Sequence, residues 1–111
     1  MSHEGVYAAV SPYVQCRHVE WPVNEEPTLP FAAYCLDYER PICVDDVQVA
    51  VKRKWSVELY EKGSDANLEK ALEGSLRAAF GNFRRDENWI ENDNLLQVVY
   101  TFYEIEGDFD G

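Results

Sequence analysis

The sequence is poor in the residues that build metal centres, disulfide frameworks and nucleophilic active sites. Its 111 residues include two histidines and three cysteines. Cys16, Cys35 and Cys43 are odd in number and lack Cys-x-x-Cys spacing, so we expect no disulfide framework and a reducing compartment. Glycine-rich phosphate loops and the Gly-x-Ser-x-Gly and His-Glu-x-x-His motifs are absent, so the common sequence signatures of catalysis are missing.

Basic residues and long apolar runs are also scarce. Ten Lys and Arg oppose 21 Asp and Glu, which gives a formal net charge of −11. Affinity for phosphates comes from Lys and Arg, so this balance disfavours simple binding of nucleic acids or anionic lipid surfaces. No run of 18 apolar residues occurs, and no basic region followed by an apolar run opens the sequence. We therefore expect neither a membrane-spanning helix nor a secretory signal.

The composition is that of a folded domain. Hydrophobic residues make up 46% of the chain and aromatic residues 14%, far more than a disordered chain carries. The length suits one domain. We expect that domain over residues 1–105 and a flexible acidic tail over residues 106–111. The acidic excess either serves solubility or forms a surface that lies near DNA without binding it.

Two strands and one helix have clear apolar periods. Alternation predicts strands over residues 49–60 and 95–105, each with a buried face. Arg53 interrupts the apolar parity of the first strand, so it either snorkels at the core edge or marks a bulge. An apolar stripe at helical spacing predicts a helix over 68–80, after an N-cap at Gly63-Ser64-Asp65 and ended by Gly81.

The remaining segments have weaker patterns. We predict a short helix over 4–13 cut by Pro12, strands over 14–21 and 31–36, a loop or loose hairpin end over 37–46, and a connecting strand or turn over 83–90 anchored by Trp89 and Ile90. Strands grouped around a helix favour the α+β class. We expect an antiparallel β-sheet of about four strands packed against one long helix, plus the short N-terminal helix.

Three kinds of site are conceivable, for zinc, for calcium or for a cysteine nucleophile, and the spacing of the candidate residues supports none of them. Zinc could be held by Cys16 and His18 with Cys35 and Cys43, but paired ligand spacing occurs once only. Calcium could be held by the acidic alternation Glu104, Glu106, Asp108 and Asp110, but the chain ends where the bidentate Glu would stand. A Cys–His nucleophile would need Cys16 or Cys35. We therefore expect no catalytic, cofactor-binding or metal-binding residue, and no enzyme.

Charged and apolar positions instead suggest contacts between subunits. Two small basic spots occur in the sequence, Lys52-Arg53-Lys54 and Arg84-Arg85. They are too small to bind nucleic acid, so they are either ordinary solvated charges or partners of acidic surface on a neighbour. A second, half-apolar face of the 95–105 strand exceeds what one small domain needs to hide, and Ile105 shares it. The candidate interface residues are Asp45, Asp46, Lys52, Arg53, Lys54, Arg84, Arg85, Leu95, Val99 and Tyr103.

Three stretches carry a resemblance to a known family: LPFAAY (29–34), KWSVELYEKGSDANLEKALEGSLRAAF (54–80) and NWIENDNLLQVVYTFYEI (88–105). In this order they resemble the tail-completion, or tail-terminator, proteins encoded among the head–tail joining genes of long-tailed bacteriophages. The residues that match that family's elements are Pro30-Phe31, Asp45-Asp46, Val57-Glu58-Leu59-Tyr60, Asp65, Trp89-Ile90-Glu91 and Gln97-Val98-Val99-Tyr100-Thr101-Phe102. The chain departs from the family in its shorter N-terminal helix and its more acidic end.

The resemblance implies a structural virion protein that forms a ring of six subunits at the head-proximal end of the tail. Such a ring stops polymerisation of the tail tube and joins the tail to the head connector. Its partners would be other copies of itself, the major tail tube protein and the head-connector or stopper protein. DNA would pass through the lumen without specific binding. The implied location is the virion neck, and the host cytoplasm before assembly.

Two other functions remain open from the sequence. One is another neck component, a head-completion or stopper subunit. The other is an acidic regulator, such as an inhibitor or immunity protein, that binds one basic protein one to one and forms no ring. Position in the genome, and whether the pure protein caps tail tubes or capsid portals, would separate these possibilities.

Elemental analysis tests the expected absence of zinc. Protein purified without chelator should contain zinc well below one atom per chain, because the ligand pairs of a structural zinc site are missing. One tightly held zinc per chain, lost together with the fold in Cys16→Ala, would contradict this expectation.

Overall fold

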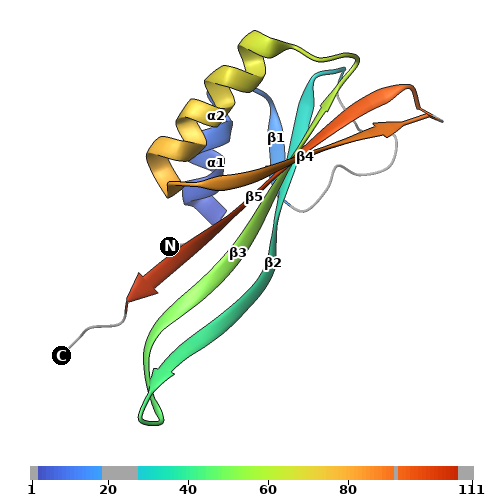
Figure 1. Ribbon diagram of the computed structural model, residues 1–111. Helices are drawn as coiled ribbons and strands as arrows, with labels where there is room; N and C mark the ends of the chain where they lie inside the picture. Colours follow the sequence, from blue (N-terminus) through green and yellow to red (C-terminus); the bar gives the residue numbers. More distant parts are fainter. Residues whose placement is uncertain (1–2, 19–27, 92, 108–111) are drawn as a thin grey trace.

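A computed structural model describes residues 3–18, 28–91 and 93–107 of the chain. The elements are α1 (His3–Val10), β1 (Cys16–His18), β2 (Phe31–Val44), β3 (Val47–Glu61), α2 (Ala66–Phe80), β4 (Phe83–Ile90) and β5 (Leu95–Gly107). Figure 1 shows one twisted sheet with both helices beside its upper part and a long hairpin of β2 and β3 that extends away from them.

The sheet has five strands in the order β1-β2-β3-β5-β4. β1 pairs with β2 in parallel, and the other three neighbouring pairs are antiparallel. The expected four-stranded antiparallel sheet is therefore wrong, because the sheet is mixed. β1 has three residues, too few for an alternation that would reveal its direction from sequence.

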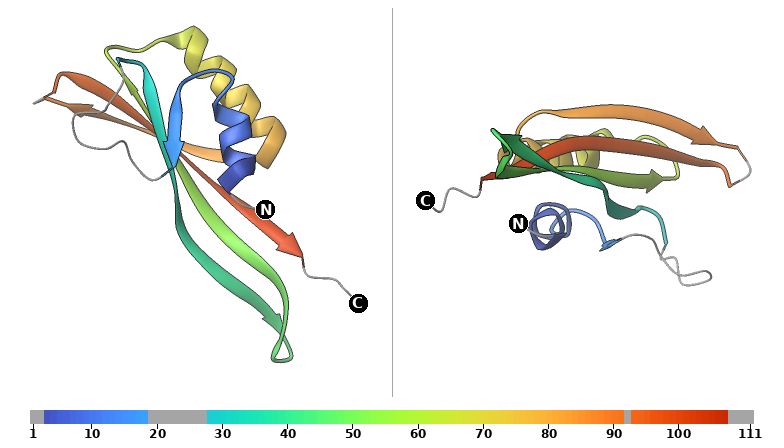
Figure 2. Two further views of the ribbon diagram at one scale, coloured as in Figure 1. Left: turned by 180° about the vertical axis from the view of Figure 1, so that it is seen from behind. Right: turned by 90° about the horizontal axis from the view of Figure 1, so that it is seen from below.

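Both helices contribute to one hydrophobic core, so the expected arrangement of a sheet packed against one long helix is also wrong. α1 contacts β1, β2 and α2, whereas α2 contacts β4 and β5. Val6 and Val10 of α1 are fully buried in the same cluster as Leu72 and Leu76 of α2. Each helix thus covers a different part of the same sheet face, which Figure 2 shows from two further sides. Neither described helix is long and apolar enough to cross a membrane.

The sheet side of the core follows the predicted alternation. Register places Leu59 opposite both Ala32 and Val98, and Val57 opposite Tyr100. Cross-strand partners point to the same face, so these positions form continuous rows beneath the helices. The buried sheet residues of the cluster are Ala32, Tyr34, Trp55, Val57, Leu59, Val98, Tyr100 and Phe102.

The caps predicted for the long helix are confirmed. The Asp65 side chain accepts a hydrogen bond from the Leu68 backbone N–H at 3.1 Å, as an N-cap does. Gly81 follows the last turn with φ of 85°, a conformation that costs glycine little, and its N–H bonds the carbonyl of Arg77.

Residues 37–46, expected as a loop or loose hairpin end, instead continue β2 and complete a hairpin. Its two-residue turn is Asp45-Asp46, with φ of 51° and 65°. Two successive positive φ angles are typical of a type I′ turn, whose twist matches that of the two strands it joins. Aspartate tolerates the left-handed backbone conformation that such a turn requires. A register shift between Leu36 and Tyr38 leaves Asp37 as an extra residue in β2. A second register shift lies between Ile42 and Cys43, so neither irregularity is at Arg53.

The edge strand and the C-terminal end of the described chain differ from expectation in detail. Residues 83–90 form the edge strand β4, but Trp89 is 52% exposed, so the prediction that it anchors this segment to the core is wrong. β5 includes Glu106 and Gly107, which we had assigned to the tail. The rest of that tail, residues 108–111, and residues 19–21 of the predicted first strand lie outside the described residues.

Leu72→Ala tests the core beneath α2. Leu72 is fully buried, and its truncation should lower the free energy of unfolding by about 2–5 kcal/mol, because a cavity remains. Urea unfolding measures this. Leu36→Ala is the matched control, since Leu36 is 39% exposed and should show a clearly smaller loss. A change below about 0.5 kcal/mol for Leu72→Ala would show that α2 does not face a core.

Candidate subunit interface

The sheet face opposite the helices has no described element packed on it. Register pairs Tyr103 with Lys54 and Ile105 with Lys52, so these four side chains share that face. Tyr103 is 46% exposed and Ile105 is 64% exposed. β5 thus has the second, partly apolar face that the sequence predicted, with Val99 half-buried on it. Its role as a subunit contact stays a prediction.

Alternation along β3 separates the three basic residues that are contiguous in sequence. Lys52 and Lys54 lie on the uncovered face, whereas Arg53 lies on the face that the helices cover further along the strand. The hairpin extends beyond the helices (Figure 1). There Arg53 meets side chains of the neighbouring strands β2 and β5. The expected basic spot is therefore divided between the two faces of the hairpin stem.

The uncovered side of the stem, here the cationic face, consists of Tyr38, Arg40, Lys52, Lys54 and Tyr103. The Arg40 guanidinium lies 4.4 Å from the Tyr38 ring centroid, and the Lys52 amine lies 4.5 Å from that of Tyr103. Lys54 lies 4.0 Å from a carboxylate oxygen of Asp37 and 5.9 Å from the Tyr38 ring centroid. Among described residues, Arg40 and Lys52 have no carboxylate within ion-pair distance. Arg40 and Tyr38 were not among the sequence candidates, because no strand alternation was recognised in their segment, which was expected to be a loop or loose hairpin end.

The opposite side of the stem, here the acidic face, consists of Glu39, Arg53, Glu104 and Glu106. Arg53 lies 2.6 Å from Glu39, 3.3 Å from Glu104 and 2.9 Å from Glu106. Hydrogen bonds to Glu106 and Glu39 raise the pKa of Arg53, so it stays charged. Three carboxylates therefore surround one guanidinium on this face. Arg53 is thus an ion-paired residue and not a free cation.

The hairpin tip carries the candidate acids Asp45 and Asp46. Both are exposed, and the valines that flank them, Val44 and Val47, are 56% and 61% exposed. Leu95 lies at the other end of the sheet, where it pairs with Ile90. The structure therefore does not bring all ten candidates together: it gathers Lys52, Lys54 and Tyr103, and it separates them from Asp45, Asp46 and Leu95.

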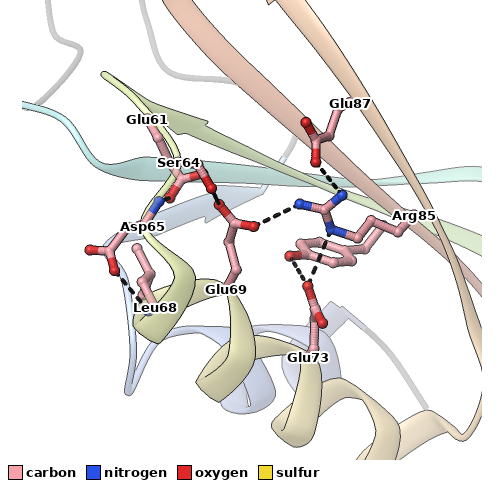
Figure 3. A network of polar contacts seen from close by, with 9 residues as sticks. Glu61, Ser64, Asp65, Leu68, Glu69, Glu73, Arg85 and Glu87 are labelled. Atoms are coloured by element: carbon pink, nitrogen blue, oxygen red, sulfur yellow. Dashed lines mark hydrogen bonds and ion pairs between the residues drawn. The ribbon is translucent and has the colours of Figure 1, made fainter.

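The second basic spot is divided in the same way. Arg84 points away from the helices, and its exposed side chain lies 3.0 Å from Asp86. Arg85 points toward α2 and pairs with Glu69 at 2.6 Å, with Glu73 at 3.3 Å and with Glu87 (Figure 3). Arg85 therefore fastens the edge strand β4 to α2 and leaves Arg84 as the solvent-facing cation.

A carboxyl pair continues this network toward the start of α2. Glu61 and Glu69 are 2% and 6% exposed. Ser64 donates to Glu69 at 3.0 Å, and the Asp65 backbone N–H donates to Glu61 at 3.1 Å (Figure 3). Among the described residues, no donor reaches the other Glu61 carboxyl oxygen, so it is unsatisfied when Glu61 is ionised. A protonated Glu61 can instead donate a hydrogen bond to Glu69.

Burial, and next its hydrogen bond to Glu69, raise the pKa of Glu61 to about 8. Burial alone would also raise the pKa of Glu69, but hydrogen bonds from Glu61, Arg85 and Ser64 outweigh it and lower that pKa. The pair therefore shares one proton and one negative charge near neutral pH. The sequence held one signal of this pair, since Glu61 extends the buried parity of Leu59.

The three cysteines lie apart, and two of them are held as thiols. Cys16 is on β1, Cys35 on the uncovered face of β2 and Cys43 near the hairpin tip. Burial raises the thiol pKa of Cys16 and of Cys35 to about 11, so neither is a thiolate at neutral pH. Within the described residues no three His, Cys, Asp or Glu side chains could hold a metal ion together. Asp108 and Asp110 of the calcium alternative lie outside those residues.

One open depression gathers several polar side chains. It has a volume of about 370 Å³ beside α1 and β1, and His18 stacks on Tyr34 there with ring centroids 5.2 Å apart. Cys16 is part of its lining and is held as a thiol. The depression therefore offers an aromatic surface but no activated nucleophile.

Glu61→Gln tests the shared proton. Because the folded-state pKa of Glu61 is above its ordinary value of 4.5, the folded state binds this proton more tightly than the unfolded state. The stability that Glu61 contributes is complete below pH 4.5 and is lost as the pH rises toward about 8. Urea unfolding should show less loss across this window in Glu61→Gln, which becomes more stable than the wild type above pH 8.

Glu58→Gln, on the uncovered face of the same strand, is the control and should keep the wild-type loss of stability. Parallel pH profiles for Glu61→Gln and the wild type would show that Glu61 is already ionised in the folded protein.

The fold, but not the sequence, is similar to a known protein. No protein-family model matches the chain, and neither does any curated protein. The fold is similar to that of a chain in the solved virion of a native gene transfer agent particle, with a TM-score of 0.52 and 12% identity. That match covers 92% of this chain and 84% of the other chain. At 12% identity the similarity shows a shared arrangement of helices and strands and nothing more.

Proposed function

We propose that this protein is a structural component of a tailed bacteriophage or phage-like particle, and that it forms the ring that ends the tail where the tail meets the head. The observation that carries the proposal is the likeness in fold to a chain of a gene transfer agent virion, over 92% of this chain. The order of the sequence stretches that resemble tail terminators supports the same assignment independently of that likeness.

The uncovered sheet face is the structural feature that fits a ring subunit. Tyr103 and Ile105 are exposed beside Lys52 and Lys54, on a face with no described covering element. Exposed apolar surface rimmed by charge marks protein contacts more often than catalytic sites. A subunit of a closed ring needs two different surfaces, because each copy meets its two neighbours through different patches.

The charge of the chain fits a channel for DNA. A net charge of −11 disfavours tight contact with a phosphate backbone. A ring of such subunits would let DNA pass its lumen without arrest. The partners of the ring are the tail tube on one side and the head connector on the other.

Deletion of the gene in the particle's genome tests the role. Tails should become overlong or fail to join filled heads, because nothing caps the growing tube. Electron microscopy of lysates measures this, and a plasmid copy of the gene should restore joined particles. Heads that lose their packaged DNA, with tails of normal length, would point to the head-completion subunit instead. Normal tails joined to heads would exclude both neck roles and favour the one-to-one regulator.

A further inference from the structure

We propose that the hairpin stem is a head-to-tail contact between copies of this chain, in which the cationic face of one copy packs on the acidic face of the next. This contact rests on the proposed function for its biological setting. It names the two surfaces that successive subunits use, both carried by the strands β2, β3 and β5.

The two faces have opposite charge on one thin ribbon. The cationic face presents Arg40, Lys52 and Lys54, with Asp37 as the only carboxylate recorded near them in the described residues. The acidic face presents three carboxylates around one arginine, and the side chains of Glu39 and Glu106 are 50% and 48% exposed. Cross-strand partners share a face, so the pleat assigns these charges to opposite sides.

The cationic face also carries apolar surface of the kind found in protein–protein contacts. The rings of Tyr38 and Tyr103 lie beneath the cations, and the exposed Ile105 adjoins Lys52. Tyrosine is enriched at interface cores, where its ring supplies area and its hydroxyl remains hydrogen-bonded. A nucleic acid fits less well, because three cations on a chain with a charge of −11 give little phosphate affinity.

The charges favour a second copy of this chain as the partner that binds the cationic face. Every copy carries both faces, so a contact between unlike faces can repeat from subunit to subunit and closes into a ring if the rotation allows. Repulsion between whole acidic chains is screened beyond about 8 Å at physiological salt, whereas close pairs across the contact are screened less. The charges then fix register and orientation.

Two complementary variants test the contact. Lys52→Glu with Lys54→Glu removes the cationic face, and Glu39→Gln with Glu106→Gln weakens the acidic face while Glu104 still pairs Arg53. Each double variant alone should lose the concentration-dependent amide shifts that the wild type shows in nuclear magnetic resonance spectra at physiological salt. An equal mixture of the two should form a one-to-one pair that does not extend, because one intact face of each kind remains.

Isotope labelling locates the surfaces. With the lysine variant labelled, the mixture should shift amides around Glu39, Arg53 and Glu104; with the glutamate variant labelled, it should shift those around Tyr38, Lys52 and Tyr103. Salt raised well above the physiological concentration should reduce both sets of shifts, because exposed pairs across the contact are then screened as well. Lys62→Glu with Lys70→Glu is the matched control: it changes the charge equally at exposed positions outside the stem and should associate as the wild type does.

Other outcomes overturn the proposal. Absence of shifts in the mixture at the highest soluble concentration, or equal shifts in each variant alone, would exclude the contact. Shifts of the cationic face on addition of duplex DNA, without shifts between copies, would assign that face to nucleic acid. If the tails of the deletion particle are normal but the mixture pairs as expected, the neck role fails and the contact stands. Overlong tails with no pairing would leave the role intact and exclude this contact.

Discussion

The structure depends on the burial of one sheet face beneath two short helices. One buried cluster joins the sheet to Leu72 and Leu76 of α2 and to Val6 and Val10 of α1, and few other elements remain to build a core. Apolar burial is the main favourable term in folding, so this single layer of contacts must stabilise the whole domain. The helices cover only part of the sheet, and the hairpin stem continues beyond them to give the molecule a longest dimension of 50 Å.

That partial coverage explains where the charges lie. Under the helices the sheet face is apolar, whereas on the stem the same parity carries Glu39, Arg53 and Glu104. At the opposite end of the covered region, the carboxyl pair Glu61–Glu69 and Arg85 join the start of α2 to β3 and β4. A buried ionic network contributes less to net stability than apolar packing, but loss of one member leaves a buried charge unpaired. We interpret this network as a device that fixes α2 relative to β3 and β4.

The sequence predicted the elements with a strong period most fully, and it predicted those with a weaker pattern only in part. The alternation of β3 and β5 and the apolar stripe of α2 identified the core, and Asp65 and Gly81 bounded α2 correctly. Residues 37–46 were predicted as a loop or loose hairpin end because charge and Pro41 mask the alternation. Both faces of a stem beyond the core are solvated, however, and need no apolar period. Pairing partners and direction depend on contacts distant in sequence, so the parallel β1 could not be predicted.

The candidate interface was predictable in part for the same reason. Tyr103 and Val99 could be placed on the second face of β5 by parity alone, and parity also separates Arg53 from Lys52 and Lys54. Whether a basic side chain is free or paired depends on strands that meet only in the fold: Arg53 finds Glu104, and Arg85 finds Glu69. The cationic face gained Arg40 and Tyr38 only when residues 37–44 proved to be strand.

The most direct test of the central claim is a cryo-electron microscopy reconstruction of the particle that encodes this chain. The account predicts a closed ring of this fold between the last layer of tail tube and the head connector, with the hairpin stems of adjacent copies in contact. Density for this fold in the capsid, the tail tube or the tail tip, or its absence from the particle, would contradict the assignment.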